Sequence, residues 1–145
     1  MVIDIKRLRL KGKSGCSFHF DYEADDALLT LPESSFSGAV SVTGELEVDG
    51  EDVFVNGEIS YSINTVCSRC LTPTVYEKVV PFDEKFSPSD DEAYPYYKET
   101  VDLTDMVNDK IILSLPYAVY CKDDCKGLCP TCGADLNKGQ CDCNK

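Results

Sequence analysis

The chain has 145 residues and a formal net charge of −12, and this length fits one domain with at most a small appendage. Its apolar fraction of 43% is sufficient for a core. No apolar run approaches the roughly 18 residues that a membrane helix needs. The acidity argues against loose, sequence-independent binding of nucleic acid, which requires a Lys/Arg surface.

The N-terminal residues 1–7 contain no apolar h-region and no small-residue cleavage site, so we expect a cytoplasmic protein. In a reducing compartment disulfides are disfavoured, and clustered cysteines bind metal or carry out redox chemistry. Residues 6–13 form a local basic strip. We interpret the strip as the solvated face of a strand, with a local nucleic-acid contact as the alternative.

The first half of the chain is predicted to be mostly strands. Apolar residues alternate with polar ones over residues 2–10 and 16–22, which indicates two strands. After a loop marked by proline and glycine, alternation returns over residues 39–48 and 53–66. Asp49-Gly50 between them is a strong turn signal, because glycine tolerates the positive φ of tight hairpin turns. We therefore expect a long hairpin centred on Asp49-Gly50.

The second half contains one more strand, a loop and one helix. Residues 74–86 are rich in Val, Tyr and Phe and should return as a strand, and the acidic, proline-broken residues 87–99 indicate a loop. Helical spacing of apolar residues predicts a core helix over 102–115. Asp102 is its expected N-cap, and Pro116 ends it because the residue before proline avoids the α region.

These elements predict an α+β fold, with a mostly antiparallel β-sheet, a long hairpin, one main helix and a small C-terminal zinc-knuckle segment. Residues 1–120 should form the β-rich core domain, with its helix near 102–115. Residues 121–145 should form a Cys-rich zinc-binding tail, packed on or beside the core.

The chain has nine cysteines, and eight of them are spaced like metal ligands. Cys16 lies alone on an expected strand face, where we predict a buried free thiol. The other eight form four pairs, which match two tetrahedral Cys₄ zinc sites. The pairs are Cys67 and Cys70, Cys121 and Cys125, Cys129 and Cys132, and Cys141 and Cys143.

Two of the pairs have the chemistry of zinc knuckles. In Cys129-Pro130-Thr131-Cys132-Gly133, the proline sets φ in advance and the glycine permits a tight turn that aims backbone amides at sulfur. Cys67-Ser68-Arg69-Cys70 lies between two expected strands, where a hairpin tip would carry it. Arg69 could neutralise part of the thiolate charge there.

The spacing leaves open which pairs share an ion. Proximity favours one site made of Cys129, Cys132, Cys141 and Cys143, and a second made of Cys67, Cys70, Cys121 and Cys125. The second site would close a long loop between the hairpin tip and the segment after the helix. The rival grouping places Cys121, Cys125, Cys129 and Cys132 around one ion. We favour the first grouping.

Other uses of these cysteines fit the sequence less well. An iron–sulfur cluster also takes four thiolates. A redox dithiol at Cys67 and Cys70 would need a βαβ context, whereas this pair precedes a strand. A catalytic zinc usually has histidine or carboxylate ligands, and the single histidine, His19, alternates with two phenylalanines as a solvent-side strand residue. We expect closed structural sites and no enzymatic activity.

In combination, several segments resemble the bacterial YceD family, also called the large ribosomal RNA subunit accumulation proteins. They include a helix that opens at Val101-Asp102-Leu103 and ends at Leu115-Pro116. The others are residues 67–71, the tail over 124–137, and Cys141-Asp142-Cys143. The Cys-rich tail is similar to that of members from Gram-positive-type bacteria.

The resemblance implies a non-enzymatic, cytoplasmic role in ribosome biogenesis. The protein would support accumulation of large-subunit rRNA by binding precursor rRNA, a basic ribosomal protein, or both. No membrane and no small-molecule substrate is implied. A zinc carrier or thiol redox sensor is the alternative that cysteine density suggests, and a hydrolase or nuclease acting on rRNA is a third. The sequence does not give the oligomeric state.

Overall fold

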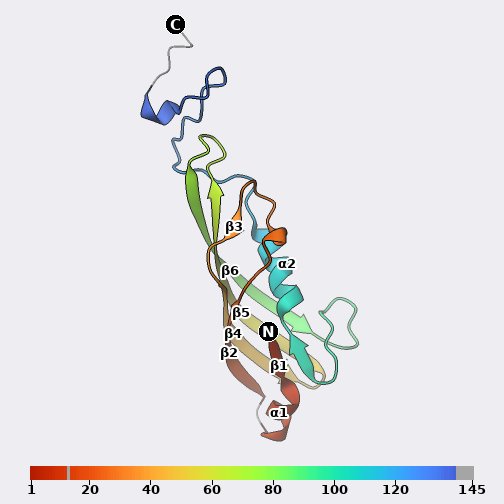
Figure 1. The fold of residues 1–145 in the computed structure, drawn as a ribbon. Coiled ribbons are helices and arrows are strands. Elements are labelled where there is room, and N and C mark those ends of the chain that lie inside the picture. Colours follow the sequence, from red (N-terminus) through yellow and green to blue (C-terminus); the bar gives the residue numbers. More distant parts are fainter. Residues whose placement is uncertain (13, 140–145) are drawn as a thin grey trace.

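The computed structural model describes residues 1–12 and 14–139, and it has the predicted α+β architecture (Figure 1). In chain order the elements are β1 (Val2–Asp4), α1 (Ile5–Leu10), β2 (Gly15–Tyr22), β3 (Ser35–Phe36), β4 (Val40–Asp49), β5 (Asp52–Val66), β6 (Pro73–Phe86), β7 (Thr100–Asp102) and α2 (Thr104–Ser114). Short 3-10 turns lie at Asp26–Leu28 and Leu136–Lys138.

The predicted long hairpin forms the centre of an antiparallel sheet. In this sheet β2 pairs with β4, and β4 pairs with β5. Both β3 and β6 also pair with β5: β3 pairs beyond the end of β4, and β6 pairs along the opposite edge. Asp49 pairs with Asp52, so the loop residues are Gly50 and Glu51, one position later than predicted. Gly50 has a φ of 63°, which glycine adopts without steric cost at the first central position of such a turn.

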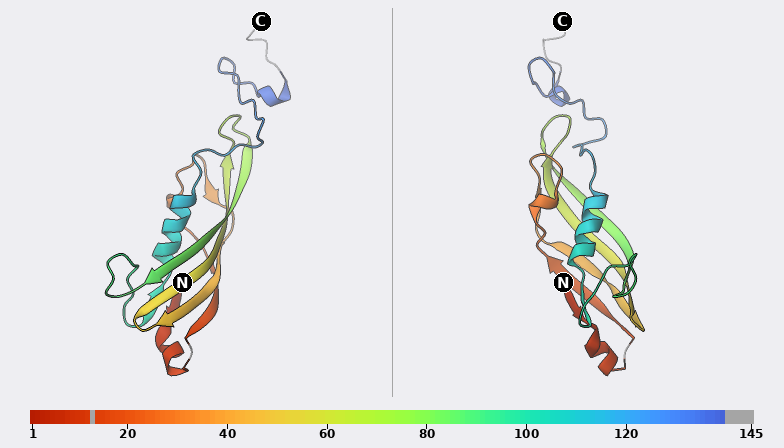
Figure 2. Two further views of the ribbon diagram at one scale, coloured as in Figure 1. Left: turned by 180° about the vertical axis from the view of Figure 1, so that it is seen from behind. Right: turned by 90° about the vertical axis from the view of Figure 1, so that its right-hand side faces the viewer.

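One face of this sheet is covered by α2, and the core lies between them (Figure 2). The predicted apolar face of the helix is buried, since Leu103, Met106, Val107 and Ile111 have no exposed surface. They pack with the alternate residues of β4 and β5 that point to the same side, among them Val42. No described segment covers the opposite face of the sheet, where Glu45 and Glu58 are exposed.

The prediction of a strand over residues 2–10 is wrong beyond Asp4. The Asp4 carboxylate accepts a hydrogen bond from the backbone N–H of Lys6 at 3.0 Å, which caps α1. Ile5 and Leu8 have helical spacing and face the core, with Ile5 fully buried. The basic strip therefore lies largely on a short helix and not on a strand face.

Residues 100–102, before the helix, form a short strand that the sequence did not reveal, and this strand pairs with β1. The helix begins at Thr104, two residues after the expected cap. The Asp102 carboxylate still accepts hydrogen bonds from the backbone N–H of Thr104 at 3.0 Å and from its hydroxyl at 2.6 Å. Asp102 thus satisfies a donor at the helix start, as a capping residue does.

The β5–β6 hairpin continues beyond the rest of the sheet, and the last described segment lies at its tip (Figure 1). The strands pair in register up to Val66 and Pro73, so residues 67–72 form the tip. Helix α2 runs toward this tip, and the residues that follow the helix lie at the tip. Over the described residues, the structure has no helix long and apolar enough to cross a membrane.

Candidate metal centre

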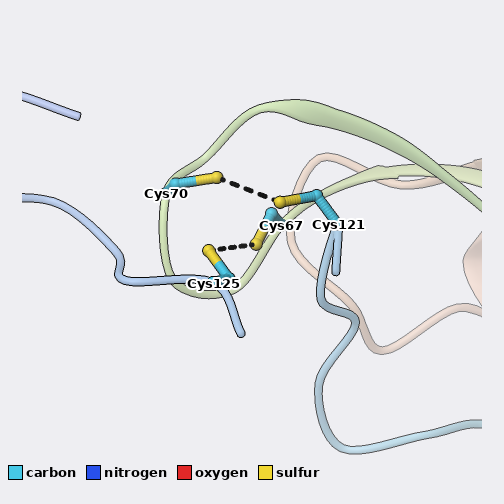
Figure 3. A group of neighbouring side chains, drawn as sticks. All are labelled: Cys67, Cys70, Cys121 and Cys125. Carbon is cyan, nitrogen blue, oxygen red and sulfur yellow. Dashed lines mark hydrogen bonds between the residues drawn. The ribbon is translucent and has the colours of Figure 1, made fainter. Parts of the chain in front are cut away.

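The tip of the β5–β6 hairpin presents Cys67 and Cys70 from one tight turn. The backbone N–H of Leu71 donates to the Cys67 carbonyl at 2.9 Å, and the Cys67 N–H donates to the Thr72 carbonyl at 2.8 Å. Leu71 closes the turn with a φ of 62°, in the left-handed region. This turn brings both sulfur atoms to the same side of the hairpin (Figure 3).

The segment after α2 is fixed to the tip by two hydrogen bonds between Ser68 and Val119. The Ser68 N–H donates to the Val119 carbonyl at 2.7 Å, and the Val119 N–H donates to the Ser68 hydroxyl at 3.1 Å. Val119 is buried there. The contact places Cys121 and Cys125 opposite the hairpin cysteines.

The four sulfur atoms of Cys67, Cys70, Cys121 and Cys125 all lie within 4.8 Å of one another. The Cys67–Cys125 and Cys70–Cys121 sulfur distances are both 3.6 Å (Figure 3). A disulfide bond is about 2.05 Å long, so these are separate thiols. Zinc–sulfur bonds of about 2.3 Å in a tetrahedron would separate sulfurs by about 3.8 Å, so the cluster can hold a metal ion.

The environment of the thiols favours ionisation of some and opposes that of others. Burial opposes ionisation of Cys67, but backbone N–H groups of Cys121, Cys70 and Arg69 outweigh it and lower the pKa of Cys67 to about 6. Burial and the neighbouring thiols raise the pKa of Cys121 to about 12. Four thiolates at this spacing would repel one another strongly, so full deprotonation requires a cation.

Each side of the site is stabilised by polar partners of the sulfurs. Thr72 lowers the pKa of Cys70 through its hydroxyl, which lies 3.1 Å from the Cys70 sulfur, and through its backbone N–H. The Asn137 side-chain amide donates to the Cys125 sulfur at 3.4 Å. Such partners orient metal ligands and reduce the repulsion between thiolates.

Arg69, which was expected to neutralise part of the thiolate charge, joins the two segments through two other contacts. Its guanidinium donates to the Cys125 carbonyl at 3.0 Å. It also lies 4.4 Å from the ring centroid of Tyr120, in a cation–π contact. Gly127 packs so close to the Arg69 backbone that a Cβ at this position would lie 3.2 Å from the Arg69 carbonyl oxygen.

The remaining pairs lie outside this cluster. Cys129 is buried and Cys132 exposed in a second tight turn, in which the Gly133 N–H donates to the Cys129 carbonyl at 2.9 Å. Gly133 has a φ of 76°, as predicted for the knuckle. Cys141 and Cys143 lie outside the described residues, so the second metal site stays a prediction.

The other two candidate residues lie on the sheet. Cys16 is only half-buried, against the core and away from the tip, so full burial was wrong. His19 is on the solvent side of β2, as expected, and its ring bonds Thr43 at 2.7 Å and Asp21 at 3.2 Å. Over the described residues, the only group of cysteine, histidine or acidic side chains close enough to hold a metal is the cluster at the tip.

Sequence reasoning missed the residues that support the sulfurs. Thr72 could have been found from the sequence, because a hydroxyl two residues after a ligand cysteine is within reach of its sulfur. Asn137 could not have been found in this way, because its contact with Cys125 depends on how the tail folds back over residues 125–137. No local pattern marks that approach.

Comparison with known proteins settles the family. A sequence model of the family described as Large ribosomal RNA subunit accumulation protein YceD matches residues 55–145. The chain belongs to this family. The YceD match includes both tight Cys turns and the segment after α2, that is, every residue of the candidate metal centre.

Relatives of this YceD protein extend over bacteria and a plant. The uncharacterized protein Rv2926c of Mycobacterium tuberculosis is 30% identical over 147 residues, covering 94% of this chain and 70% of the relative. YlbN of Bacillus subtilis is 27% identical, covering 82% and 74%. The chloroplastic YCED homolog 1 of Arabidopsis thaliana is 35% identical over 36% of this chain and 16% of its own. No solved structure shows significant similarity.

Proposed function

We propose that this protein is a zinc-binding factor in ribosome biogenesis, which supports accumulation of large-subunit rRNA without catalysing a reaction. Membership of the YceD family supports the ribosomal role. The cluster of four sulfurs at the hairpin tip supports the metal. A reducing cytoplasm would keep the cysteines available as thiolates.

A single zinc ion fits these four sulfurs better than a multi-iron cluster does. Four sulfurs within 4.8 Å of one another enclose space for one ion, whereas a multi-iron cluster with bridging sulfides needs a wider cage. An all-thiolate tetrahedral set is typical of structural zinc and leaves no open position for a substrate. We propose a second ion at Cys129, Cys132, Cys141 and Cys143.

Metal analysis of the purified protein tests this arrangement. We expect two zinc ions per chain in the wild type, and one in each of Cys67→Ser and Cys132→Ser, because each variant removes a ligand from a different site. Cys16→Ser is the matched control and should retain both ions. A wild-type protein purified without bound metal would contradict the proposal.

The open face of the sheet indicates the chemistry of the partner. In β2, β4, β5 and β6, the residues that alternate with the core residues lie on this face. Many of them are acidic and exposed: Asp21, Glu45, Glu47, Glu58, Glu77 and Asp83. Lys85, on the same face, is held in ion pairs by Asp90 and Asp52. The exposed side chains of Val75 and Val79 add apolar surface.

This face favours a basic ribosomal protein over rRNA as the direct partner. Carboxylates repel the phosphates of RNA and attract Lys and Arg side chains. Exposed valines beside them offer contact area that a folded or extended protein segment can cover. The effect on rRNA accumulation would then be indirect, through a protein that itself binds rRNA.

Charge reversal on the open face distinguishes the two partners. In pull-downs at low salt, the double variant Glu45→Lys/Glu58→Lys should lose ribosomal proteins. The control Asp91→Lys/Glu92→Lys makes the same charge change in the loop after β6 and should retain them. If the protein still recovered precursor rRNA from which the ribosomal proteins had been removed, it would bind RNA directly, and this choice of partner would be contradicted.

A zinc carrier or thiol redox sensor remains the second candidate, because Cys121 and Cys132 are exposed. Carriers release metal quickly, whereas buried ligands exchange slowly, and Cys67, Cys70 and Cys125 are buried. Transfer of zinc to a competing apo-protein within seconds would favour the carrier. We expect transfer over hours.

A further inference from the structure

We propose that Asn137 is a positioning residue for the metal centre, through which the folded tail holds Cys125 in the geometry of a ligand. This inference rests on the zinc part of the proposed function. Asn137 follows Cys125 by 12 positions and comes from the last 3-10 turn, Leu136–Lys138. It is not a ligand itself.

The side-chain amide of Asn137 contacts both the sulfur and the backbone next to it. Its Nδ2 donates to the Cys125 sulfur at 3.4 Å, and its Oδ1 accepts from the Lys126 N–H at 2.9 Å. One planar group thus fixes the side chain of residue 125 and the peptide that follows it. Two such contacts restrict the χ1 rotation that would turn the sulfur away from the other three.

The orientation of this amide is determined by its other neighbour. The Asp135 carboxylate accepts from Asn137 Nδ2 at 3.0 Å and from the Asn137 backbone N–H at 2.9 Å. If the amide were flipped, its oxygen would face a carboxylate and its NH₂ would face the Lys126 N–H. The donor must therefore point toward Asp135 and the Cys125 sulfur.

The tail that carries Asn137 is itself a small folded unit. The Leu136 N–H donates to the Gly127 carbonyl at 3.0 Å, and Leu128 and Asp135 form an antiparallel bridge. Its knuckle, at Cys129 and Cys132, belongs to the proposed second site. Folding of the tail therefore determines where Asn137 lies, and Asn137 connects that folding to the first site.

An N–H donor reduces the charge on a thiolate and supports the bound state of the ligand. Outer partners of metal ligands typically contribute about 10- to 100-fold to metal affinity. A carboxylate at the same position would instead add negative charge beside sulfur. We therefore expect the metal affinity of the first site to be lower with a carboxylate at residue 137 than with an amide.

A swap of two side chains tests the proposal at constant net charge. The double variant Asp135→Asn/Asn137→Asp keeps an amide–carboxylate pair in the turn but places the carboxylate next to Cys125. The single variant Asp135→Asn is the matched control, because it keeps the Asn137 amide and an oxygen acceptor at 135. Both are made in the otherwise wild-type chain, so that the second site keeps the tail folded, and each is paired with a Cys67→Ser version that reports the second site alone.

Zinc affinity, by competition with a chromophoric chelator, and the thiolate-to-cobalt absorption band of the Co²⁺-loaded protein are the measurements. We expect the swap to bind zinc at the first site at least tenfold more weakly than either the wild type, which has the same net charge, or Asp135→Asn, and to shift the cobalt band. Equal affinities and identical spectra would overturn the proposal, as would an equal loss in both variants, which tail unfolding would explain. If Cys67→Ser removed no zinc from the otherwise wild-type chain, the proposed zinc site itself would fail, and this inference with it.

Discussion

Arg69 shows how one side chain can join two segments of chain that are distant in sequence. Its guanidinium contacts the Cys125 carbonyl, 56 residues away, and stacks on the Tyr120 ring. Neither contact requires a metal. The arginine therefore holds the segment after α2 near the hairpin tip before the sulfurs have an ion to share, which lowers the entropy lost on binding.

Replacement of Arg69 by alanine should weaken this joint. We expect a loss of about 1–2 kcal/mol, because an exposed cation–π contact contributes about 0.5–1 kcal/mol and the guanidinium hydrogen bond about 1 kcal/mol more. The loss should appear as a decrease in zinc affinity of about 5- to 30-fold, measured by chelator competition. Arg7→Ala on α1 is the control and should leave the affinity unchanged. An unchanged affinity in Arg69→Ala would contradict the role of this residue.

Helix α2 is the element that connects the core with the candidate metal centre. Its buried face is fixed by Met106, Val107 and Ile111, each with no exposed surface. Tyr61 on β5 is hydrogen-bonded to Ser114 at 2.8 Å near the end of the helix. Because the chain leaves α2 directly toward Cys121, the packing of this helix sets the position of two ligands.

Two substitutions in α2 separate packing from helix propensity. Ile111→Ala removes a fully buried side chain and should lower the free energy of unfolding by about 2–5 kcal/mol, since it leaves a cavity. Leu113→Ala, at a side chain that is 81% exposed, should change it by less than about 0.5 kcal/mol. Urea denaturation followed by circular dichroism measures both. Similar losses in the two variants would contradict the packing described for α2.

At the scale of the whole molecule, the residues that the structure describes form two separate buried clusters. The main core lies between the sheet and α2, and a second cluster consists of Cys67, Cys70 and Cys125 with Leu128 packed against it. The first is apolar and forms by burial alone. The second is small and rich in thiols, so it depends on an ion for most of its stability.

Removal of metal should therefore unfold the tail and spare the core. In hydrogen exchange with a strong chelator present, we expect amides of residues 121–139 to lose protection. Amides of β5 between Val53 and Ile63 should keep theirs. Simultaneous loss in both regions would mean that the protein is one cooperative unit, and no loss in either would contradict a structural metal.

The sequence by itself determined the long strands of the sheet, helix α2 and the tight Cys turns, because each depends on residues a few positions apart. Alternation over 40–48, the turn at Gly50 and the helical spacing up to Ile111 are all local signals. The same rule failed at residues 5–10, where the apolar spacing also fits a helix and the Asp4 cap decided between them.

Only the tertiary structure decided which thiols meet. The sulfur pairs of Cys67 with Cys125 and of Cys70 with Cys121 join residues 58 and 51 positions apart. Their approach results from the length of β5 and β6, the packing of α2 and the folding back of the tail onto Asn137. Spacing of ligands along a chain left two groupings open, because it does not record how distant segments pack.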